Sequence, residues 1–336
     1  MITISLCMIV KNEEKILKRC LDSVADLVDE LIIVDTGSTD STKEIAAAYP
    51  GVLLYDFTWI DDFAAARNYA FSKATKEYIY SADADEVLDE ENRERFRILK
   101  EALLPEVEIV QMKYGNQLQF GTVYNYDEEY RPKLFKRLRE FVWEEPIHET
   151  IRISPVIYDS DIVITHMPQS SHAGRDFAAF LKAVKRGERL SGRLLNMYAK
   201  ELFLVGEKED FIQARSVFYE AARDTERNQD TVKEACLVTA AAARRGGDDA
   251  VFFQFAVKVL ADGGCSELCR EFGDFYFEKE DFEEAAIWYY NACYETEPIL
   301  ALKTAGGETL EKLALCYDKL GLPEEAAKYR SEAGRW

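Results

Sequence analysis

Four short apolar runs in the first 85 residues constrain the fold of this chain more than any other feature. They cover residues 2–10, 31–34, 52–57 and 78–82, and helical patterns separate them. Continuous apolar strands are typical of a parallel sheet that helices cover on both faces. Asp35 ends the second run, and Asp83 follows the fourth. Because the carboxyl ends of parallel strands meet at one edge of a sheet, where ligands bind, we expect Asp35 and Asp83 to lie in one cleft.

The segments between these strands supply further candidates. Asn12 is placed to cap the first helix, and Ser41 with Glu44 can form a capping box for the second. Arg67 falls on a helix predicted over residues 63–74, whose start faces the same edge of the sheet. Its guanidinium suits a carboxylate or a phosphate, although an ordinary surface arginine is equally consistent with the pattern. No G-x-G-x-x-G motif follows the first strand, so a dinucleotide is a poor guess.

The stretch Ser81–Glu86, sequence SADADE, places three carboxylates directly after the fourth strand. In an extended segment the side chains of Asp83 and Asp85 point the same way, so both can reach one hard cation. A divalent metal held there can bridge a diphosphate. The alternative is a solvated acidic turn before the next helix, which starts near Asp89.

Composition limits the partners of the chain. Its 336 residues are enough for two domains, and 42 basic against 62 acidic residues give a net charge of −20. This charge repels nucleic acid and anionic membranes, whereas a small phosphorylated ligand remains possible because a metal can invert the local field. No basic leader and no apolar run of about 18 residues occurs, so we expect a cytoplasmic protein without a transmembrane segment. The seven cysteines are expected to be buried free thiols.

The second half of the chain has a different pattern. From Asp176 onward strand signals stop, and alanine and aromatic residues recur at helical spacing, for example in Asp210–Ala221 and Asp281–Ala292. This spacing is typical of tetratricopeptide repeats. We therefore predict a catalytic domain over residues 1–172 and an all-α helical-repeat domain over residues 173–336. The repeats can bind an acceptor, join two subunits as a homodimer, or only buttress the first domain.

Four blocks in the first half, taken in order, resemble glycosyltransferase family 2, in particular its bacterial branch with C-terminal helical repeats. They are ISLCMIVKNEE (4–14), IVDTGSTD (33–40), ARN (66–68) and ADADE (82–86). The resemblance implies a Rossmann-like α/β domain of the A-type glycosyltransferase fold. It also implies a nucleotide-sugar donor, a divalent metal (Mn or Mg) and inversion at the anomeric carbon.

By the same resemblance, Asp35 binds the nucleoside at its base, Arg67 contacts the nucleotide, Asp83 lies near the ribose and the metal, and Asp85 ligates the metal. The predicted nucleotide-sugar site as a whole consists of Val10, Asn12, Glu13, Asp35, Arg67, Asp83, Ala84 and Trp143.

The segment WEEPIHE (143–149) also resembles a segment of this family. An inverting transfer needs a base opposite the leaving group, and we predict Glu149, with Glu145 and Glu144 as alternatives. Trp143 can wall the sugar pocket or belong to the core. His148, or His166 at the end of a predicted strand, can supply a third metal ligand, although a structural histidine is an alternative.

The leading hypothesis is a metal-dependent inverting transferase that moves a hexose from a UDP-sugar to a peptide or protein side chain. A surface polysaccharide or lipid-linked glycan is the alternative acceptor. Two other classes are a nucleotidyltransferase, disfavoured because no glycine-rich phosphate loop follows the first strand, and a helical-repeat scaffold with an inactive catalytic domain.

Overall fold

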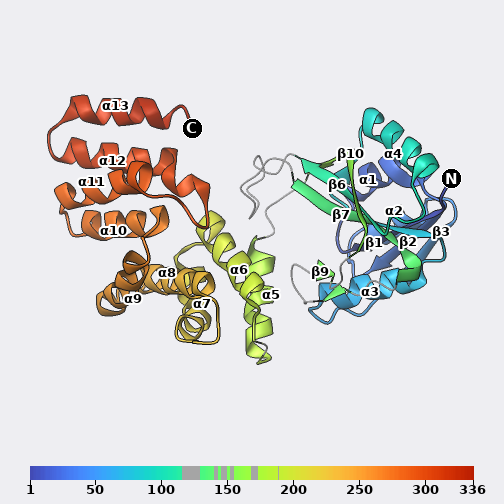
Figure 1. Ribbon diagram of the computed structural model, residues 1–336, viewed down its shortest axis with the longest axis horizontal. Coiled ribbons are helices and arrows are strands. Elements are labelled where there is room, and N and C mark those ends of the chain that lie inside the picture. Colours follow the sequence, from blue (N-terminus) through green and yellow to red (C-terminus); the bar gives the residue numbers. More distant parts are fainter. Residues whose placement is uncertain (116–128, 140–142, 145–149, 152–154, 168–172, 188) are drawn as a thin grey trace. The chain divides into compact units, whose positions relative to one another are not determined.

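The computed structural model describes residues 1–115, 129–139, 143–144, 150–151, 155–167, 173–187 and 189–336. The chain divides into two compact units, Met1–His172 and Ala173–Trp336. Figure 1 shows the sheet of the first unit and the helices of the second. Among the described residues, no helix is long and apolar enough to cross a membrane.

The first unit is built on an eight-stranded sheet with the order β3-β2-β1-β4-β7-β6-β10-β5. Its strands are β1 (Ile4–Val10), β2 (Glu30–Asp35), β3 (Val52–Asp56), β4 (Tyr78–Ser81), β5 (Glu86–Val87), β6 (Ile109–Gly115), β7 (Glu129–Lys136) and β10 (Ile157–His166). The short strands β8 (Trp143–Glu144) and β9 (Thr150–Ile151) pair separately. Helices α1 (Leu17–Val24), α2 (Thr42–Ala47), α3 (Phe63–Lys73) and α4 (Glu90–Ala102) connect the strands.

The direction of the strands decides which residues share an edge. β1 pairs in parallel with β2 and β4, and β2 pairs in parallel with β3. β7 is antiparallel to both β4 and β6, and β10 is parallel to β6. The sheet is therefore mixed, yet β1, β2, β3, β4, β6 and β10 all run the same way. Their carboxyl ends lie at one edge of the sheet, which we call the carboxyl edge.

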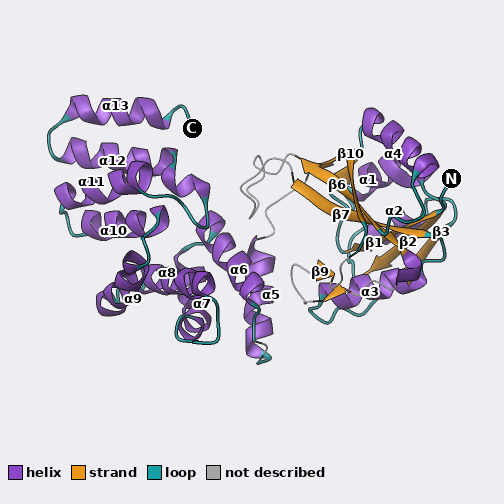
Figure 2. Ribbon diagram, viewed as in Figure 1, coloured by secondary structure: helices purple, strands orange, loops and turns teal. Residues whose placement is uncertain are grey.

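Helices cover the sheet on both faces, as the apolar strands require (Figure 2). On one face, buried residues of α1 and α4 pack against β1, β2 and β4, with Leu17, Leu21 and Phe96 among them. On the other face, Ala70 and Phe71 of α3 pack against Ile79 and Phe135. The two separate cores fix the sheet between the layers, so the loops at its carboxyl edge have rigid supports.

Two helix starts differ from the expectation. Asn12 does not cap α1: it has a φ of 56°, and Ile16 takes the N-cap position. Ser41 is the N-cap of α2, but its side chain makes no capping hydrogen bond. In both cases the polar groups of this region form hydrogen bonds between the loops after β1 and β2.

The second unit is all-helical. Its α-helices are α5 (Ala173–Lys185), α6 (Gly192–Val205), α7 (Lys208–Ala221), α8 (Gln229–Arg245), α9 (Asp249–Ala261), α10 (Ser266–Glu278), α11 (Phe282–Tyr290), α12 (Gly307–Lys319) and α13 (Pro323–Ala333). A π-helical turn, η4 (Asn291–Glu295), and a 3-10 helix, η5 (Leu302–Ala305), precede α12. From α7 onward each helix packs mainly on its neighbours in sequence. This is the arrangement of a helical-repeat array, as the periodicity predicts.

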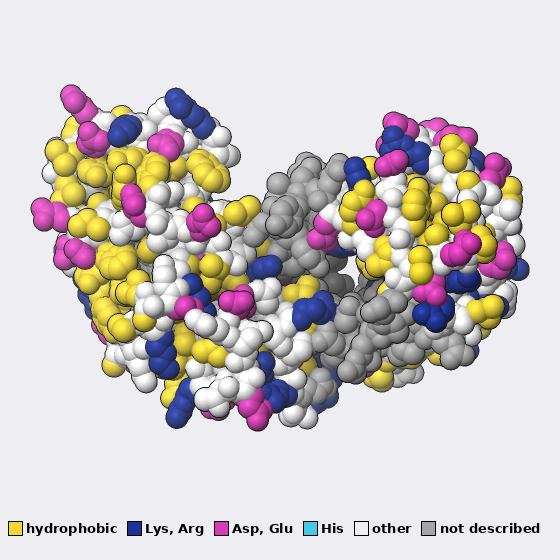
Figure 3. Space-filling view, viewed as in Figure 1, with side chains coloured by type: hydrophobic (Ala, Val, Ile, Leu, Met, Phe, Trp, Pro, Cys, Tyr) yellow, Lys and Arg dark blue, Asp and Glu magenta, His cyan; other side chains and the backbone are white. Residues whose placement is uncertain are grey.

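Small residues allow close packing between the paired helices. A Cβ on Gly273 in α10 would lie 2.5 Å from the ring of Tyr289 in α11, so only glycine fits there. Several large apolar side chains remain exposed, including Val257, Ile287 and Tyr294. Figure 3 shows hydrophobic side chains over much of the visible face of this unit. All seven cysteines are free, and six of them are buried, as expected.

Candidate active site

The loops after β1 and β2 are joined by hydrogen bonds at the carboxyl edge. The positive φ of Asn12 turns the chain directly after β1, and the Asn12 N–H donates to Ser38 Oγ at 2.9 Å. Asn12 Oδ1 in turn accepts from the Thr39 N–H at 2.8 Å. The Glu13 N–H donates to Thr42 Oγ1 at 2.7 Å, and the buried Val10 accepts from the Thr36 N–H at 2.9 Å. Val10, Asn12 and Glu13 thus form one wall with the loop that follows Asp35.

Asp35 ends β2 and is 2% exposed. Its Oδ1 accepts from the N–H groups of Gly37 and Ser38, both at 2.9 Å. Gly37 has a φ of 103°, which favours glycine, and this turn brings both N–H groups to one oxygen. Among the described residues, Asp35 Oδ2 is buried and has no hydrogen-bond partner. A buried acceptor of this kind is costly without a donor, so Oδ2 is suited to receive one from a ligand.

Arg67 reaches the carboxyl edge from α3 and is buried. Its Nη1 donates to Ser81 Oγ at 2.7 Å, and its Nη2 lies 3.5 Å from Asp83 Oδ1. Lys133 Nζ lies 3.9 Å from the other carboxylate oxygen of Asp83. Burial opposes ionisation of Asp83, but Arg67 and Lys133 outweigh it and hold its pKa below the ordinary value. Asp83 is therefore a carboxylate at neutral pH.

The segment after β4 is a turn, not the extended strand that we expected. The Glu86 N–H donates to the Asp83 carbonyl at 3.2 Å, which closes the turn. The assumption that the side chains of Asp83 and Asp85 alternate along a strand is therefore wrong. Asp83 contacts Arg67 and Lys133, whereas Asp85 Oδ2 lies 3.1 Å from His166 Nε2.

The position of His166 follows from the pairing of β5 with β10. Glu86 is opposite His166 in this antiparallel ladder, and the Met167 N–H donates to the Asp85 carbonyl at 2.8 Å. The side chains of Asp85 and His166 are mostly buried, with 15% and 13% exposed. The sheet therefore holds two potential metal ligands side by side, although 81 residues separate them in sequence.

Sequence reasoning missed a buried charged layer behind the turn. Lys133 of β7 forms an ion pair with Glu86, and the side chains are 7% and 2% exposed. Burial raises the pKa of Glu86 to about 7, although Lys133 opposes this. Arg131 stacks over Tyr114, with its Cζ 3.9 Å from the ring centroid, and the same ring lies 5.1 Å from that of His166. Arg131 and Lys133 are two residues apart in β7, so their side chains lie on the same face of the sheet. This spacing could have been read from the sequence.

The pair Asp85 and His166 fits a divalent cation. Two ligands at right angles on an octahedral ion with bonds of about 2.1 Å stand roughly 3 Å apart, close to the 3.1 Å found here. A carboxylate oxygen and an imidazole also suit Mn²⁺, with phosphate oxygens as further ligands. Within the described ranges, however, no group of three or more His, Cys, Asp or Glu side chains is arranged to hold a metal ion. Further ligands must come from a bound molecule or from other parts of the chain.

Other predicted site residues are only partly described. Glu149, His148 and Glu145 lie outside the described residues. The backbone of Trp143 and Glu144 forms β8, which lies next to α3, the helix that carries Arg67. Ala84 is buried inside the turn after β4.

The fold and this edge define an α/β domain with polar groups at separate strand ends where the strand order reverses between β1 and β4, the place where open α/β sheets bind ligands. The family model "Glycosyl transferase family 2" matches residues 5–156. The first unit therefore matches the glycosyltransferase family 2 model over most of its length, and the all-helical unit follows it.

Curated relatives resemble short parts of the chain. A TPR repeat-containing protein of Synechococcus elongatus is 53% identical over 26% of this chain and 22% of its own length. The SPbeta prophage-derived glycosyltransferase SunS of Bacillus subtilis is 42% identical over 27% of this chain and 22% of its own length. The lipopolysaccharide core biosynthesis glycosyltransferase LpsC of Rhizobium meliloti is 34% identical over 30% of this chain and 36% of its own length. The matched segments thus span between 22% and 36% of these relatives.

Solved structures are more distant. Glucosyl-3-phosphoglycerate synthase from Mycobacterium tuberculosis, in complex with Mn²⁺, UDP and phosphoglyceric acid, matches with a TM-score of 0.41 and 15% identity. The match covers 57% of this chain and 81% of that one. S. aureus TarS in complex with UDP-GlcNAc matches with a TM-score of 0.38 and 13% identity. This match covers 99% of this chain and 92% of that one. At these values the likeness to both structures is remote.

Proposed function

We propose that the chain is a metal-dependent, inverting glycosyltransferase that takes a hexose from a UDP-sugar and transfers it to an acceptor hydroxyl or thiol. One observation carries this proposal: Asp35, Arg67, Asp83 and the Asp85–His166 pair come from separate elements and meet at the carboxyl edge. The match of residues 5–156 to the glycosyltransferase family 2 model supports the reaction class.

The nucleoside is assigned to the wall formed by Val10, Asn12 and Glu13. Asp35 Oδ2 is buried and can accept from a base N–H, while the Gly37 and Ser38 N–H groups hold the carboxylate in place. A uracil base offers one such donor on its pairing edge. Because Oδ1 of Asp35 already accepts two hydrogen bonds, Oδ2 selects a ligand that has a hydrogen-bond donor at this position. A ligand with an acceptor there would leave Oδ2 buried and unpaired.

The diphosphate is assigned to the part of the carboxyl edge that holds Asp85 and His166. Asp85 with His166 would hold the divalent cation, with Asp83 near the ribose and His148 as an alternative ligand. The metal would stabilise the charge that develops on the leaving diphosphate without a proton transfer. Arg67 is fixed by Ser81 and Asp83 and supplies a further positive charge beside the nucleotide.

The acceptor side involves the segment at residues 143–149. Glu149 is the proposed base, with Glu145 and Glu144 as alternatives, and Trp143 is the proposed wall of the sugar pocket. An inverting transfer requires the base on the face of the sugar opposite the diphosphate. β8 lies next to α3, which supports a place for this segment beside Arg67.

A peptide or protein side chain is the acceptor that the helical unit favours, since stacked helical repeats offer an extended concave surface. A glycan acceptor is the second candidate, because one relative is named as a lipopolysaccharide core biosynthesis glycosyltransferase.

The test is a screen of UDP-sugars for hydrolysis with and without Mn²⁺, followed by mass spectrometry of peptides incubated with the preferred donor. We expect Mn²⁺-dependent release of UDP that Asp85→Ala abolishes. Glu149→Gln should lose transfer to the acceptor while it keeps the affinity for UDP. Formation of a nucleotide-sugar from a nucleoside triphosphate and a sugar phosphate would contradict the proposal, as would an absence of turnover with every donor.

A further inference from the structure

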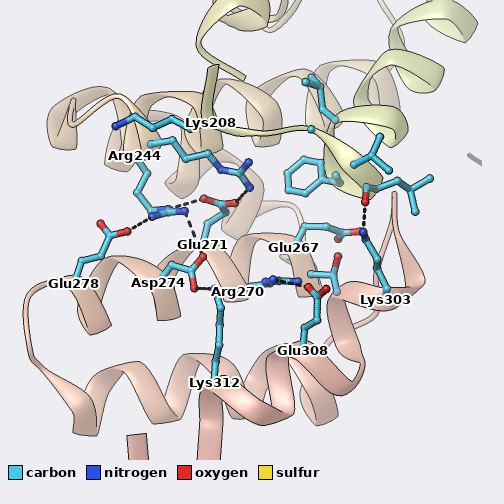
Figure 4. A pocket seen from close by; sticks show the side chains of 17 residues that line it. Lys208, Arg244, Glu267, Arg270, Glu271, Asp274, Glu278, Lys303, Glu308 and Lys312 are labelled. Carbon is cyan, nitrogen blue, oxygen red and sulfur yellow. Dashed lines mark hydrogen bonds and ion pairs between the residues drawn. The ribbon is translucent and has the colours of Figure 1, made fainter. Parts of the chain in front are cut away.

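The helical unit contains a groove of about 700 Å³. Its walls come from the carboxyl end of α6, the start of α7, and parts of α8, α10, η5 and α12 (Figure 4). All these elements belong to one unit, so its own packing sets the shape of the groove. The volume falls in the range typical of ligand sites.

Positive charge is concentrated in this groove. The helical unit, residues 173–336, contains 23 Lys and Arg against 30 Asp and Glu. Yet the groove is lined by six basic side chains and only five acidic ones. The basic ones are Lys208, Arg244, Arg245, Arg270, Lys303 and Lys312. The helical unit thus places six of its 23 basic side chains, about a quarter, around one concave surface.

Some of these charges are explained by the packing of the helices. Arg244 is buried and donates to Glu271 at 2.5 Å and to Glu278 at 2.8 Å, and it lies 3.3 Å from Asp274. Arg245 pairs with Glu271 at 2.7 Å. These contacts join α8 to α10 and satisfy both guanidinium groups, so they belong to the fold.

Two lysines are not explained in this way. In the part of the chain that the structure describes, neither Lys208 nor Lys303 has a carboxylate within ion-pair distance, and Figure 4 shows no interaction at Lys208. Lys303 donates to the Leu204 carbonyl instead. Arg270 and Lys312 each pair with one carboxylate, Glu308 at 3.0 Å and Asp274 at 2.5 Å. The groove thus has two ammonium groups to which an anion can bind without breaking an ion pair.

The wall formed by α6 has a different chemistry. Its last turn, from Leu202 to Val205, lines the groove with apolar side chains. Two of its carbonyls already have partners: the Leu202 carbonyl accepts from the Gly206 N–H, and the Leu204 carbonyl accepts from Lys303. Phosphate alone would use the lysines and leave this wall uncontacted. An acidic peptide supplies both carboxylates for the lysines and aliphatic carbons for the apolar side chains.

From these contacts we propose that the groove binds an acidic segment of a polypeptide, with its carboxylates on Lys208 and Lys303. The proposal rests on the helical unit alone and does not require the transferase activity. If the proposed function also holds, the segment recognised in this way would be part of the acceptor or of a protein that delivers it.

The test uses the full chain and a fluorescent peptide of alternating Glu and Gly, followed by fluorescence anisotropy. The Gln/Gly peptide and inorganic phosphate serve as competitors. The groove variant is Lys208→Gln with Lys303→Gln, and the matched control is Lys258→Gln with Lys328→Gln, two exposed lysines outside the groove. Circular dichroism and thermal unfolding report whether each variant remains folded.

We expect saturable binding of the Glu/Gly peptide, at least roughly tenfold weaker in the groove variant and unchanged in the control, because two charge-assisted contacts are lost. Asp85→Ala should bind the peptide like the unmodified chain, which separates this test from the transferase reaction. The proposal is overturned if the peptide does not bind, if both double variants bind equally, or if phosphate or the Gln/Gly peptide competes as well as the Glu/Gly peptide.

Discussion

The ion pairs of Glu271 lead to a prediction about pH and stability. Burial alone would raise the pKa of Glu271, but Arg245 and Arg244 outweigh it and hold the pKa below its ordinary value. A pKa that is lower in the folded than in the unfolded chain stabilises the fold above the unfolded pKa. Removing one partner of a buried ion pair costs roughly 3–5 kcal/mol at neutral pH. Glu271→Gln should therefore lower the free energy of unfolding by about that amount.

Glu278 provides the matched control. It also pairs with Arg244, at 2.8 Å, but its side chain is 61% exposed against 2% for Glu271. Solvent screens an exposed pair, so Glu278→Gln should cost less than about 1 kcal/mol. Both variants remove one carboxylate from the Arg244 guanidinium, but Glu271 is buried and also pairs with Arg245, whereas Glu278 is exposed and pairs with Arg244.

The assay is urea denaturation of the full chain, followed by far-UV circular dichroism, at several pH values. The deficit of Glu271→Gln should be largest at neutral pH and should shrink as the pH falls below 4.5, where the unmodified carboxylate begins to take up its proton. Equal deficits in the two variants would refute the reasoning, and so would a Glu271→Gln deficit that does not change over this range.

Two further predictions concern packing and buried charge. Gly273→Ala would place a methyl group 2.5 Å from the buried Tyr289 ring and should cost roughly 1–3 kcal/mol in thermal unfolding, whereas Gly334→Ala, with no atom closer than 3.7 Å, should be neutral. Lys133→Met leaves Glu86 buried without its cation and should cost roughly 1–3 kcal/mol in urea denaturation. Arg139→Met should cost less than about 1 kcal/mol, since Arg139 is half exposed; equal losses would contradict the buried-pair argument.

The sequence predicted the features that depend on local pattern. Apolar runs gave the strands that end at Val10, Asp35 and Ser81, and the helical spacing after Asp176 gave the array of paired helices. These predictions succeed because burial on both faces of a sheet, or on one face of a helix, leaves a clear periodic signal.

What the sequence could not predict depends on non-local contacts. The contact between Asp85 and His166 depends on the short antiparallel ladder of β5 with β10, and strands of two residues carry little pattern. The turn closed by the Glu86 N–H and the Asp83 carbonyl replaces the extended segment on which the simple alternation of Asp83 and Asp85 depended. Asparagine favours helix caps and also positions with a positive φ. We expected Asn12 at a helix cap, but the structure places it at a position with a positive φ.

The central claim is that carboxylates from separate strand ends form one site for a nucleoside diphosphate and its cation. Calorimetric titration of UDP, with and without Mn²⁺, tests it most directly on the unmodified chain, Asp35→Ala and Asp85→Ala. We predict that Mn²⁺ strengthens binding of UDP to the unmodified chain. Asp35→Ala should weaken binding under both conditions, whereas Asp85→Ala should remove only the gain from Mn²⁺. No binding to the unmodified chain, or the same affinity in all three proteins, would contradict the claim.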